Sequence, residues 1–275
     1  MPELPEIEAL RRLLDAPVRT AQIESVGPAH VATVKTFDPP VVALAGRRLA
    51  GARRRGKNLL FPTDDGELVL HVHLMSAGRL SYLPPAGRQP KRPAFRLDFA
   101  DGAALVLTEP GSKKRARVGL YRPDAIELEL GHLGPEALGL GVDELTGILR
   151  AQARRLHPLL RDQRALAGIG RAWSNEILLA ARLSPYALST ELTDDEVERL
   201  SRAIDDELGR GLALREQGAP DAKVYRIHGR AGQPCPHCAT PIAQIDFEEH
   251  TVYYCPSCQT GGRVLKDRRL SRLLR

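Results

Sequence analysis

Long apolar runs are missing from this chain of 275 residues, and their absence excludes a helical membrane protein. No stretch approaches the ~18 consecutive apolar residues that a membrane-spanning helix needs. The N-terminus also lacks a basic segment followed by an apolar run, which is the pattern of a secretory signal peptide. We therefore expect a cytoplasmic protein with no membrane partner.

Aromatic residues and cysteines are also scarce. Aromatic residues make up 4% of the chain against 43% hydrophobic residues, so Leu, Val, Ala and Ile must fill the cores. In a reducing compartment the four cysteines are better explained as metal ligands than as disulfides. Positive charge, in contrast, is in excess. The formal net charge of +6 favours an anionic partner, and nucleic acid is the usual one.

The hydrophobic pattern divides the chain into a strand-rich first half and a helical second half. Residues 5–15 have the spacing of an amphipathic helix. Short apolar runs, spaced as in a β-sandwich or barrel, then predict strands at 22–26, 48–54, 58–62, 68–74, 94–99, 104–108 and 118–122. Helical spacing predicts helices at 143–156, 158–161, 173–181 and 194–209. A polar, Gly-containing segment at 216–232 predicts a linker or loop.

The cysteines form the most specific motif. Cys235 and Cys238 make one C-x-x-C turn, Cys255 and Cys258 make another, and sixteen residues separate the two. This spacing is typical of a tetrahedral site with four thiolates, in which residues 240–254 form a β-hairpin. A site closed by four ligands has no open position, so we expect one structural Zn²⁺ ion.

A glycine turn precedes the helix expected near residue 173. Gly168 and Gly170 flank Ile169, and Arg171 follows. A turn of this kind that opens a helix presents backbone N–H groups to an anion such as a DNA phosphate. A tight turn between helices explains the same residues, and both interpretations stay open.

Basic residues gather in two segments of the first half. Lys57 ends a basic loop, where it is either a solvated phosphate contact or, if desolvated, an acid or base. Lys113, Lys114 and Arg115 predict a phosphate-binding loop. Met75 lies in a turn, where it is either a core residue or an apolar wedge for a DNA gap.

The N-terminal hexapeptide Met1-Pro2-Glu3-Leu4-Pro5-Glu6 has two interpretations. If Met1 is removed, Pro2 becomes a secondary amine with a pKa near ~8, which can attack an aldehyde-like carbon to form a Schiff base. Glu3 is then placed to move protons. Alternatively, Pro5 lies in the first turn of a helix and the hexapeptide is an ordinary cap.

Taken together, these motifs resemble the formamidopyrimidine-DNA glycosylase/endonuclease VIII family. MPELPEIE at the N-terminus, Lys57, AGIGRAWSNEILLAARLSP at 167–185 and CPHC…CPSC occur in the family's order. The resemblance covers nearly the whole chain, to about Gln259, and implies a bifunctional base-excision repair enzyme with glycosylase and apurinic/apyrimidinic lyase activities.

The resemblance also implies a fold of class α+β and a partner. We expect an N-terminal helix and β-sandwich domain at 1–125, a helix-two-turn-helix domain at 130–220, a zinc finger at 225–262 and a basic tail at 263–275. The implied partner is damaged double-stranded DNA, bound by a monomer.

By the resemblance, Pro2 attacks C1′ of the damaged nucleotide and Glu3 donates and shuttles protons. Glu6 helps to shape the site, and Lys57 contacts phosphate and assists strand cleavage. Met75 corresponds approximately to a residue that fills the hole left by the flipped nucleotide.

The chain departs from the family pattern at several positions. Arg171 replaces the usual phosphate-binding Asn, and His250 replaces an Arg associated with δ-elimination, which puts that step in doubt. KKRAR at 113–117 stands where an Arg-Phe pair is usual, and the segment at 216–225 is short. These changes argue against a dedicated 8-oxoguanine specificity and leave the lesion open.

Two other functions remain as alternatives. A non-catalytic DNA-binding protein would keep the fold, the finger and the basic surface, but would not need Pro2, Glu3 and Lys57 together. A zinc-ribbon RNA-binding factor would show no preference for abasic DNA over RNA.

Overall fold

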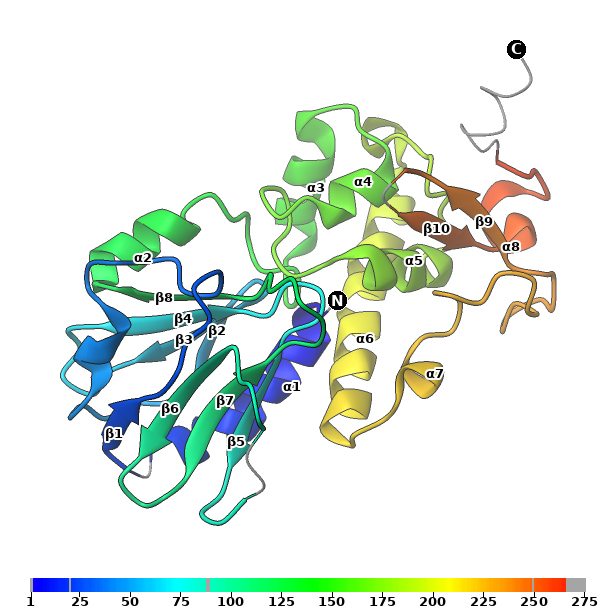
Figure 1. Ribbon diagram of the computed structural model, residues 1–275. Helices are drawn as coiled ribbons and strands as arrows, with labels where there is room; N and C mark the ends of the chain where they lie inside the picture. The colour runs from blue at the N-terminus through cyan, green and yellow to red at the C-terminus, as the bar shows by residue number, and fades with distance from the viewer. Residues whose placement is uncertain (1, 20, 88–89, 249, 266–275) are drawn as a thin grey trace. The chain divides into compact units, whose positions relative to one another are not determined.

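The computed structural model describes residues 2–19, 21–87, 90–248 and 250–265. The chain divides into two compact units, Met1–His132 and Leu133–Arg275 (Figure 1). From residue 266 on, the expected basic tail lies outside the described residues. The finer domain boundaries expected from the sequence stay predictions.

The N-terminal unit is a β-sandwich accompanied by helices. Its helical elements are α1 (Leu4–Asp15), η1 (Pro17–Arg19), η2 (Val41–Leu44) and α2 (Pro123–Leu130). Its strands are β1 (Ile23–Val26), β2 (Arg53–Arg55), β3 (Asn58–Pro62), β4 (Val69–His73), β5 (Arg79–Leu83), β6 (Phe95–Phe99), β7 (Ala104–Thr108) and β8 (Arg117–Tyr121). Within the described residues they form two antiparallel four-stranded sheets, ordered β1-β6-β7-β5 and β2-β3-β4-β8.

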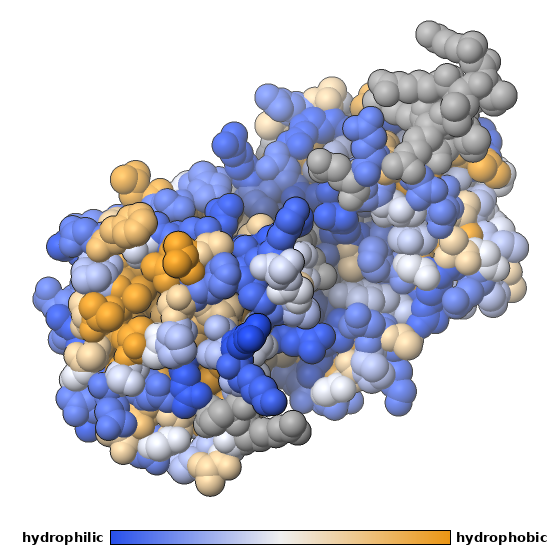
Figure 2. Space-filling view, viewed as in Figure 1, coloured by the Kyte–Doolittle hydropathy of each residue, from blue (hydrophilic) through white to orange (hydrophobic). Residues whose placement is uncertain are grey.

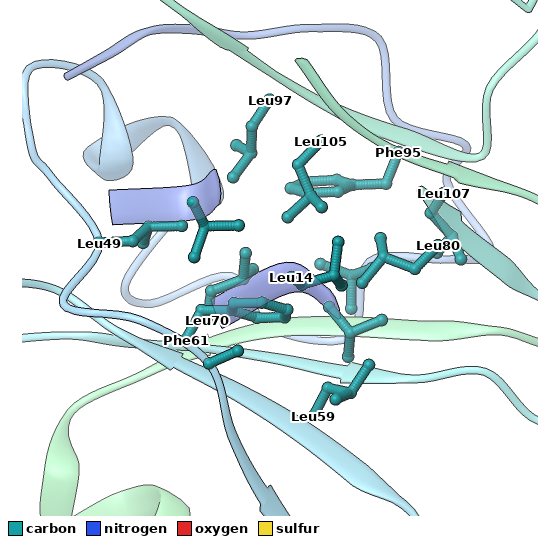
Figure 3. Packing of buried hydrophobic residues seen from close by; sticks show 14 of the residues in the cluster. Leu14, Leu49, Leu59, Phe61, Leu70, Leu80, Phe95, Leu97, Leu105 and Leu107 are labelled. Carbon is teal, nitrogen blue, oxygen red and sulfur yellow. The ribbon is translucent and has the colours of Figure 1, made fainter. Parts of the chain in front are cut away.

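The core of this unit lies between its two sheets. Figure 3 shows Leu97 and Leu105 of one sheet directed toward Leu59 and Phe61 of the other, with Leu14 of α1 beside them. The side chains of β6 alternate between buried and partly exposed, as period-2 strands do. The predicted sandwich is therefore confirmed.

The sequence analysis missed two elements of the N-terminal unit. Strand β5 carries Arg79 and Ser81 on its exposed side and has few apolar residues, but it pairs with β7 throughout its length. Helix α2 begins at Pro123, which is a favourable first residue because its missing N–H needs no partner there.

The C-terminal unit is mainly helical. Its helical elements are α3 (Val142–Ala151), α4 (Leu156–Arg161), α5 (Arg171–Ala180), η3 (Ser189–Glu191), α6 (Asp194–Glu216), α7 (Asp221–Val224) and α8 (Pro256–Thr260). Its strands β9 (Ala243–Asp246) and β10 (Thr251–Tyr254) form the predicted hairpin. Helices α5 and α6 pack closely where Trp173 is fully buried against Gly211, since a Cβ at Gly211 would lie 2.0 Å from the indole ring.

The predicted linker or loop at 216–232 is confirmed in part, because residues 217–220 and 225–232 form neither helix nor strand. Helix α6 continues to Glu216, and α7 occupies part of the segment. Val224 and Ile227 are fully buried, and Arg215 donates a hydrogen bond of 2.6 Å to Asp221. Tertiary packing thus orders a segment whose composition alone suggests a loop.

Hydrophilic side chains cover most of the face seen in Figure 2, and apolar side chains gather over part of the N-terminal unit. Among the large apolar residues of that unit, Val31 and Phe37 are each 91% exposed. None of the described helices is both long and apolar enough to cross a membrane.

Candidate functional site

Helix α1 begins within the N-terminal hexapeptide, at Leu4. Glu3 is the N-cap, and Pro5 lies in the first turn, as the capping interpretation predicts. The Glu6 carboxylate accepts a hydrogen bond of 2.9 Å from the backbone N–H of Glu3, as part of a reciprocal capping box. Glu3 is 1% exposed, whereas Pro2 is partly exposed. The cap and the Schiff-base interpretations are therefore compatible, because the cap fixes the residue that follows Pro2.

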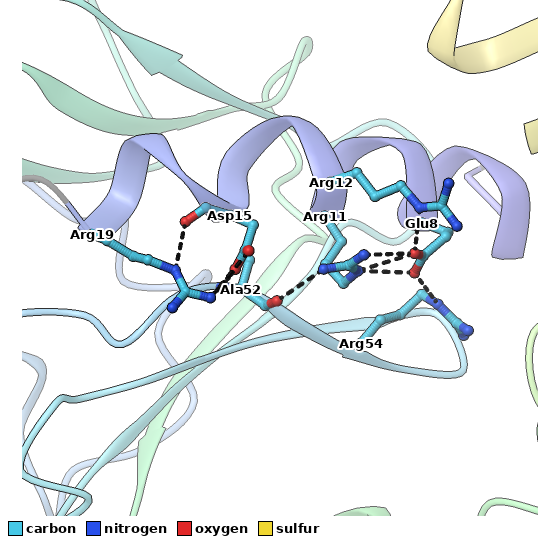
Figure 4. A network of polar contacts seen from close by, with 7 residues as sticks. All are labelled: Glu8, Arg11, Arg12, Asp15, Arg19, Ala52 and Arg54. Atoms are coloured by element: carbon cyan, nitrogen blue, oxygen red, sulfur yellow. Dashed lines mark hydrogen bonds and ion pairs between the residues drawn. The ribbon is translucent and has the colours of Figure 1, made fainter. Parts of the chain in front are cut away.

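Glu8 anchors helix α1 to strand β2 through arginines (Figure 4). Its carboxylate accepts hydrogen bonds from Arg11 (2.8 Å), Arg12 (2.9 Å) and Arg54 (3.1 Å). Burial alone would raise the pKa of Glu8, but these hydrogen bonds lower the pKa to about 2. Glu8 is consequently ionised at neutral pH and holds the helix to the sheet.

A second contact fixes the direction of the helix along the strand. Near its C-terminal end, Asp15 accepts a hydrogen bond of 2.8 Å from the backbone N–H of Ala52. Asp15 contacts Ala52, and Glu8, which is closer to the N-terminus of the helix, contacts Arg54, which is closer to the β2–β3 turn. The start of α1 and the turn that carries Lys57 therefore lie at the same end of this pair of elements.

Lys57 lies in a two-residue hairpin turn. Arg55 pairs with Asn58, which leaves Gly56 and Lys57 as the loop. Gly56 has a φ of 56°, the left-handed conformation that the first position of such a turn favours. Lys57 is only 7% exposed, so the solvated alternative is wrong and the amine is largely desolvated.

Two histidines and a second cation accompany Lys57. His73 pairs with Arg117 across β4 and β8. Burial, followed by the charges of Lys57 and Arg117, lowers the pKa of His73 to about 4. Burial likewise lowers the pKa of His71 to about 4, and its Nε2 lies 2.9 Å from Oδ1 of Asn58. At neutral pH this end of the sheet thus combines two cations with neutral imidazoles, which suits an anion. Arg117 ends the basic run of the sequence and lies at the start of β8.

Met75 occupies a constrained turn after β4. Its φ is 51°, which is uncommon for a residue with a side chain. The backbone N–H of Met75 donates to Nδ1 of His73 (3.0 Å), and the N–H of Gly78 donates to the carbonyl of Leu74 (2.9 Å). Met75 remains partly exposed, so the turn does not bury it in the core.

The glycine turn of the C-terminal unit is largely buried. Gly168, Ile169 and Gly170 are buried, and the N–H of Gly168 donates to Oε1 of Gln163 (3.0 Å). Gly168 has a φ of 108°, which favours glycine, and Gly170 is the N-cap of α5. Arg171, at the first helical position, is exposed and is the residue of this turn that faces solvent.

His250 lies at the tip of the β9–β10 hairpin. Its ring stacks on Phe247 at 4.7 Å and on His157 of α4 at 5.8 Å, measured between ring centroids. His157 is 2% exposed, and burial, followed by the charge of Arg161, lowers its pKa to about 3. The stack holds the hairpin tip against α4.

Two buried polar residues of α5 were missed by the sequence analysis. Asn175 accepts a hydrogen bond from the backbone N–H of Tyr253 (3.2 Å), and Glu176 accepts from the N–H groups of Arg226 (2.9 Å), Ile227 (3.1 Å) and His228 (2.9 Å). They tie the hairpin and the preceding segment to the helix. The available signal was an Asn-Glu pair inside an otherwise apolar stretch.

The four cysteines converge on one point. The Sγ atoms of Cys235, Cys238, Cys255 and Cys258 all lie within 4.8 Å of one another. Individual Sγ–Sγ distances of 3.4 to 4.0 Å exceed the ~2.05 Å of a disulfide. They bracket the ~3.8 Å expected between thiolates around a tetrahedral ion with ~2.3 Å bonds. The cluster is therefore suited to hold a metal ion.

Comparisons with known proteins agree with this arrangement. Residues 1–115 match the formamidopyrimidine-DNA glycosylase N-terminal domain, and residues 133–222 match the formamidopyrimidine-DNA glycosylase H2TH domain. The formamidopyrimidine-DNA glycosylase of Chloroflexus aurantiacus is 33% identical over 276 residues, which cover 94% of this chain and 98% of that protein. The Thermus thermophilus enzyme of the same name is 34% identical over 280 residues, with 95% and 100% covered.

A solved structure extends the agreement to the fold. The Lactococcus lactis formamidopyrimidine-DNA glycosylase, bound non-covalently to DNA that contains an AP site, has a TM-score of 0.83 at 25% identity. The match covers 94% of this chain and 99% of that one. The chain therefore belongs to the formamidopyrimidine-DNA glycosylase family of base-excision repair enzymes, and the resemblance of its motifs is confirmed.

Proposed function

We propose that this protein is a bifunctional DNA glycosylase and AP lyase that excises damaged bases from double-stranded DNA through a Schiff base on Pro2. One observation carries the proposal. The capping box fixes the N-terminus of α1 at the end of the helix–strand pair where the buried Lys57 lies. A protein that only binds DNA needs no such arrangement.

The chemistry begins with the free amine of Pro2, once Met1 is removed. The amine attacks C1′ of the damaged nucleotide, so an N–C1′ bond forms while the bond from C1′ to the base breaks. Glu3 supplies the proton that the departing base takes up. The amine then loses its N–H proton, the C1′–O4′ bond breaks, and O4′ takes up a proton, which leaves an iminium between the proline nitrogen and C1′. Loss of a C2′ proton from this iminium breaks the C3′–O bond and releases the 3′ phosphate ester as the leaving group, which is β-elimination.

Lys57, Met75 and the first-half basic loop bind and position the strand. The nearly buried ammonium of Lys57 pairs with phosphate more strongly than an exposed one would, because little water competes. Met75, partly exposed in a constrained turn, fills the space left by the flipped nucleotide. Lys113 and Arg115 are exposed and contribute phosphate contacts.

Residues of the C-terminal unit bind other phosphate groups of the DNA. Arg171, exposed at the start of α5, donates to a backbone phosphate in place of the family's Asn. Gly168 and Gly170 shape the turn that presents it. His250 replaces the Arg associated with δ-elimination, and we expect β-elimination products to predominate.

The metal of the four-cysteine cluster is proposed to be one Zn²⁺ ion. Backbone N–H groups of His237 and Cys258 lie 3.5 and 3.4 Å from the sulfurs of Cys235 and Cys255, which stabilises thiolates. The ion fixes the finger hairpin and takes no part in the reaction. We also propose a monomer that acts in the cytoplasm, a location that suits a site of unpaired thiolates.

The function is tested by incision of a panel of duplexes, each carrying one defined lesion. The panel includes an oxidised pyrimidine, a ring-opened purine, an alkylated base, an interstrand crosslink and an abasic site. Cleavage of the abasic duplex and of at least one base lesion supports the proposal and identifies the substrate. Tight binding without cleavage of any duplex would instead support the non-catalytic alternative.

A further inference from the structure

The loop between β7 and β8 is organised by a buried acid that the proposed reaction does not use. Glu109 directly follows β7 and is only 6% exposed. Its Oε2 atom accepts two hydrogen bonds, from the backbone N–H of Arg115 (2.8 Å) and of Ala116 (3.0 Å). A single carboxylate oxygen thus joins the start of the loop to residues six and seven positions later in the sequence.

Lys114 closes the same loop from the inside. Its ammonium donates to the backbone carbonyl of Glu109 and to that of Gly111 (2.7 Å). Gly111, with a φ of 81°, provides the reversal that brings these carbonyls together. The sequence analysis expected Lys114 to contact DNA, but its charge satisfies carbonyl groups of its own loop.

The remaining basic side chains of the loop consequently face outward. Lys113 and Arg115 are exposed on either side of the inward Lys114, and Ala116 is fully buried beneath them. A flexible loop would present these charges in many directions. The two bonds to Glu109 fix the backbone that carries these side chains, so less conformational entropy is lost when an anion binds.

We propose that Glu109 is a positioning residue that holds Lys113 and Arg115 in place to bind the phosphate groups of a damaged duplex. The inference rests on the proposed function. Because the two backbone bonds go to one oxygen, a glutamine can replace the acid without opening the loop. An alanine cannot accept either bond, and an aspartate is one methylene too short.

The test compares Glu109→Ala and Glu109→Gln with the wild type in binding a duplex that contains a tetrahydrofuran abasic analogue. We expect Glu109→Ala to raise Kd ~10-fold and Glu109→Gln to stay within ~2-fold, since two side chains lose their fixed orientation only in the first variant. The slope of log Kd against log salt should not change, because every cation remains. The single-turnover incision rate at saturating enzyme should also stay the same.

Two controls separate positioning from general damage. Asp65→Ala removes a carboxylate that accepts from Thr63 and Glu67 in another loop of the same unit, and it should leave Kd unchanged. Hydrogen exchange at the N–H groups of Arg115 and Ala116 should accelerate in Glu109→Ala and not in Glu109→Gln. Hydrogen exchange therefore measures the order of the loop backbone directly, in the absence of DNA.

The inference is overturned if both Glu109 variants bind as tightly as the wild type. It is also overturned if both bind more tightly, since the acid would then act only through its repulsion of phosphate. Failure of the proposed function is a separate result, seen as a wild-type protein that binds the analogue and incises no duplex.

Discussion

The two units of this protein hold their functional residues by different means. In the N-terminal unit, hydrogen bonds from arginines to Glu8 and a capping box at Glu3 fix the start of α1. In the C-terminal unit, four sulfurs gather at one point, and Asn175 and Glu176 secure the neighbouring backbone. The first unit therefore depends on protonation state, whereas the second depends mainly on a metal.

The largest expected effect is that of metal removal on the C-terminal unit. Chelation or Cys258→Ala should release the β9–β10 hairpin, because a structural zinc contributes on the order of 10 kcal/mol to the folding of a finger. We expect hydrogen-exchange protection to be lost at Thr251–Tyr254 and DNA affinity to fall ~100-fold.

The matched control is His237→Ala, which alters the same knuckle without removing a proposed ligand. It should bind one metal ion and keep the hairpin protected. A metal-free protein whose hairpin stays protected would show that the two units are held in the same way.

The next effect is that of Lys57 in the N-terminal unit. Lys57→Met should lower the incision rate ~100-fold, because a desolvated charge beside the strand is lost. Single-turnover incision of an abasic duplex measures this. Lys91→Met removes an exposed lysine of the same unit and should change the rate less than ~2-fold. Equal incision rates in the Lys57→Met and Lys91→Met variants would show that Lys57 has no role in incision.

A smaller effect concerns Glu8 and the stability of the N-terminal unit. Glu8→Gln should reduce the free energy of unfolding by about 2 kcal/mol at pH 7, since the hydrogen bonds from three arginines lose a charged acceptor. The pKa of Glu8 is lowered to about 2, below its unfolded value of 4.5. Its contribution is therefore complete above pH ~4.5 and is lost as pH falls toward ~2. Urea unfolding at several pH values should show the two proteins converging over this range.

The smallest effect at neutral pH concerns a buried histidine of the C-terminal unit. The folded pKa of His157 is about 3, below its ordinary 6.5, so the unfolded chain takes up a proton first as pH falls. Its neutral form therefore costs stability from pH ~6.5 downward, by up to ~1.4 kcal/mol per pH unit. His157→Phe keeps a ring against His250 and should flatten the loss of stability between pH 6.5 and ~3, with little change at pH 7. An unchanged slope would show that His157 is already charged in the folded state.

The parts of the fold that were predicted from sequence are those fixed by local pattern. The period of two in Phe95–Phe99 and the start of α6 at Asp194 both follow from neighbouring residues. The packing of the segment at 216–232 could not be predicted from its composition, because Glu176, which is distant in sequence, accepts hydrogen bonds from three of its backbone N–H groups.

The candidate site shows the same limit. The residue types and the cysteine spacing indicated the chemistry, but spacing does not show where a side chain points. Lys114 has the same charge as Lys113, and only the fold shows that it turns inward onto the carbonyl of Gly111. Spacing likewise does not show that Lys57 is buried, at 7% exposed.

The central claim is that Pro2 forms the covalent intermediate. The most direct test is borohydride trapping on duplex DNA with an abasic site, followed by peptide mass spectrometry of the adduct. We expect the mature protein to begin at Pro2 and to carry the reduced DNA adduct on that residue, and Pro2→Gly to lose the adduct. An adduct on Lys57 or another lysine, or a mature chain that retains Met1 and still forms the adduct, would contradict the claim.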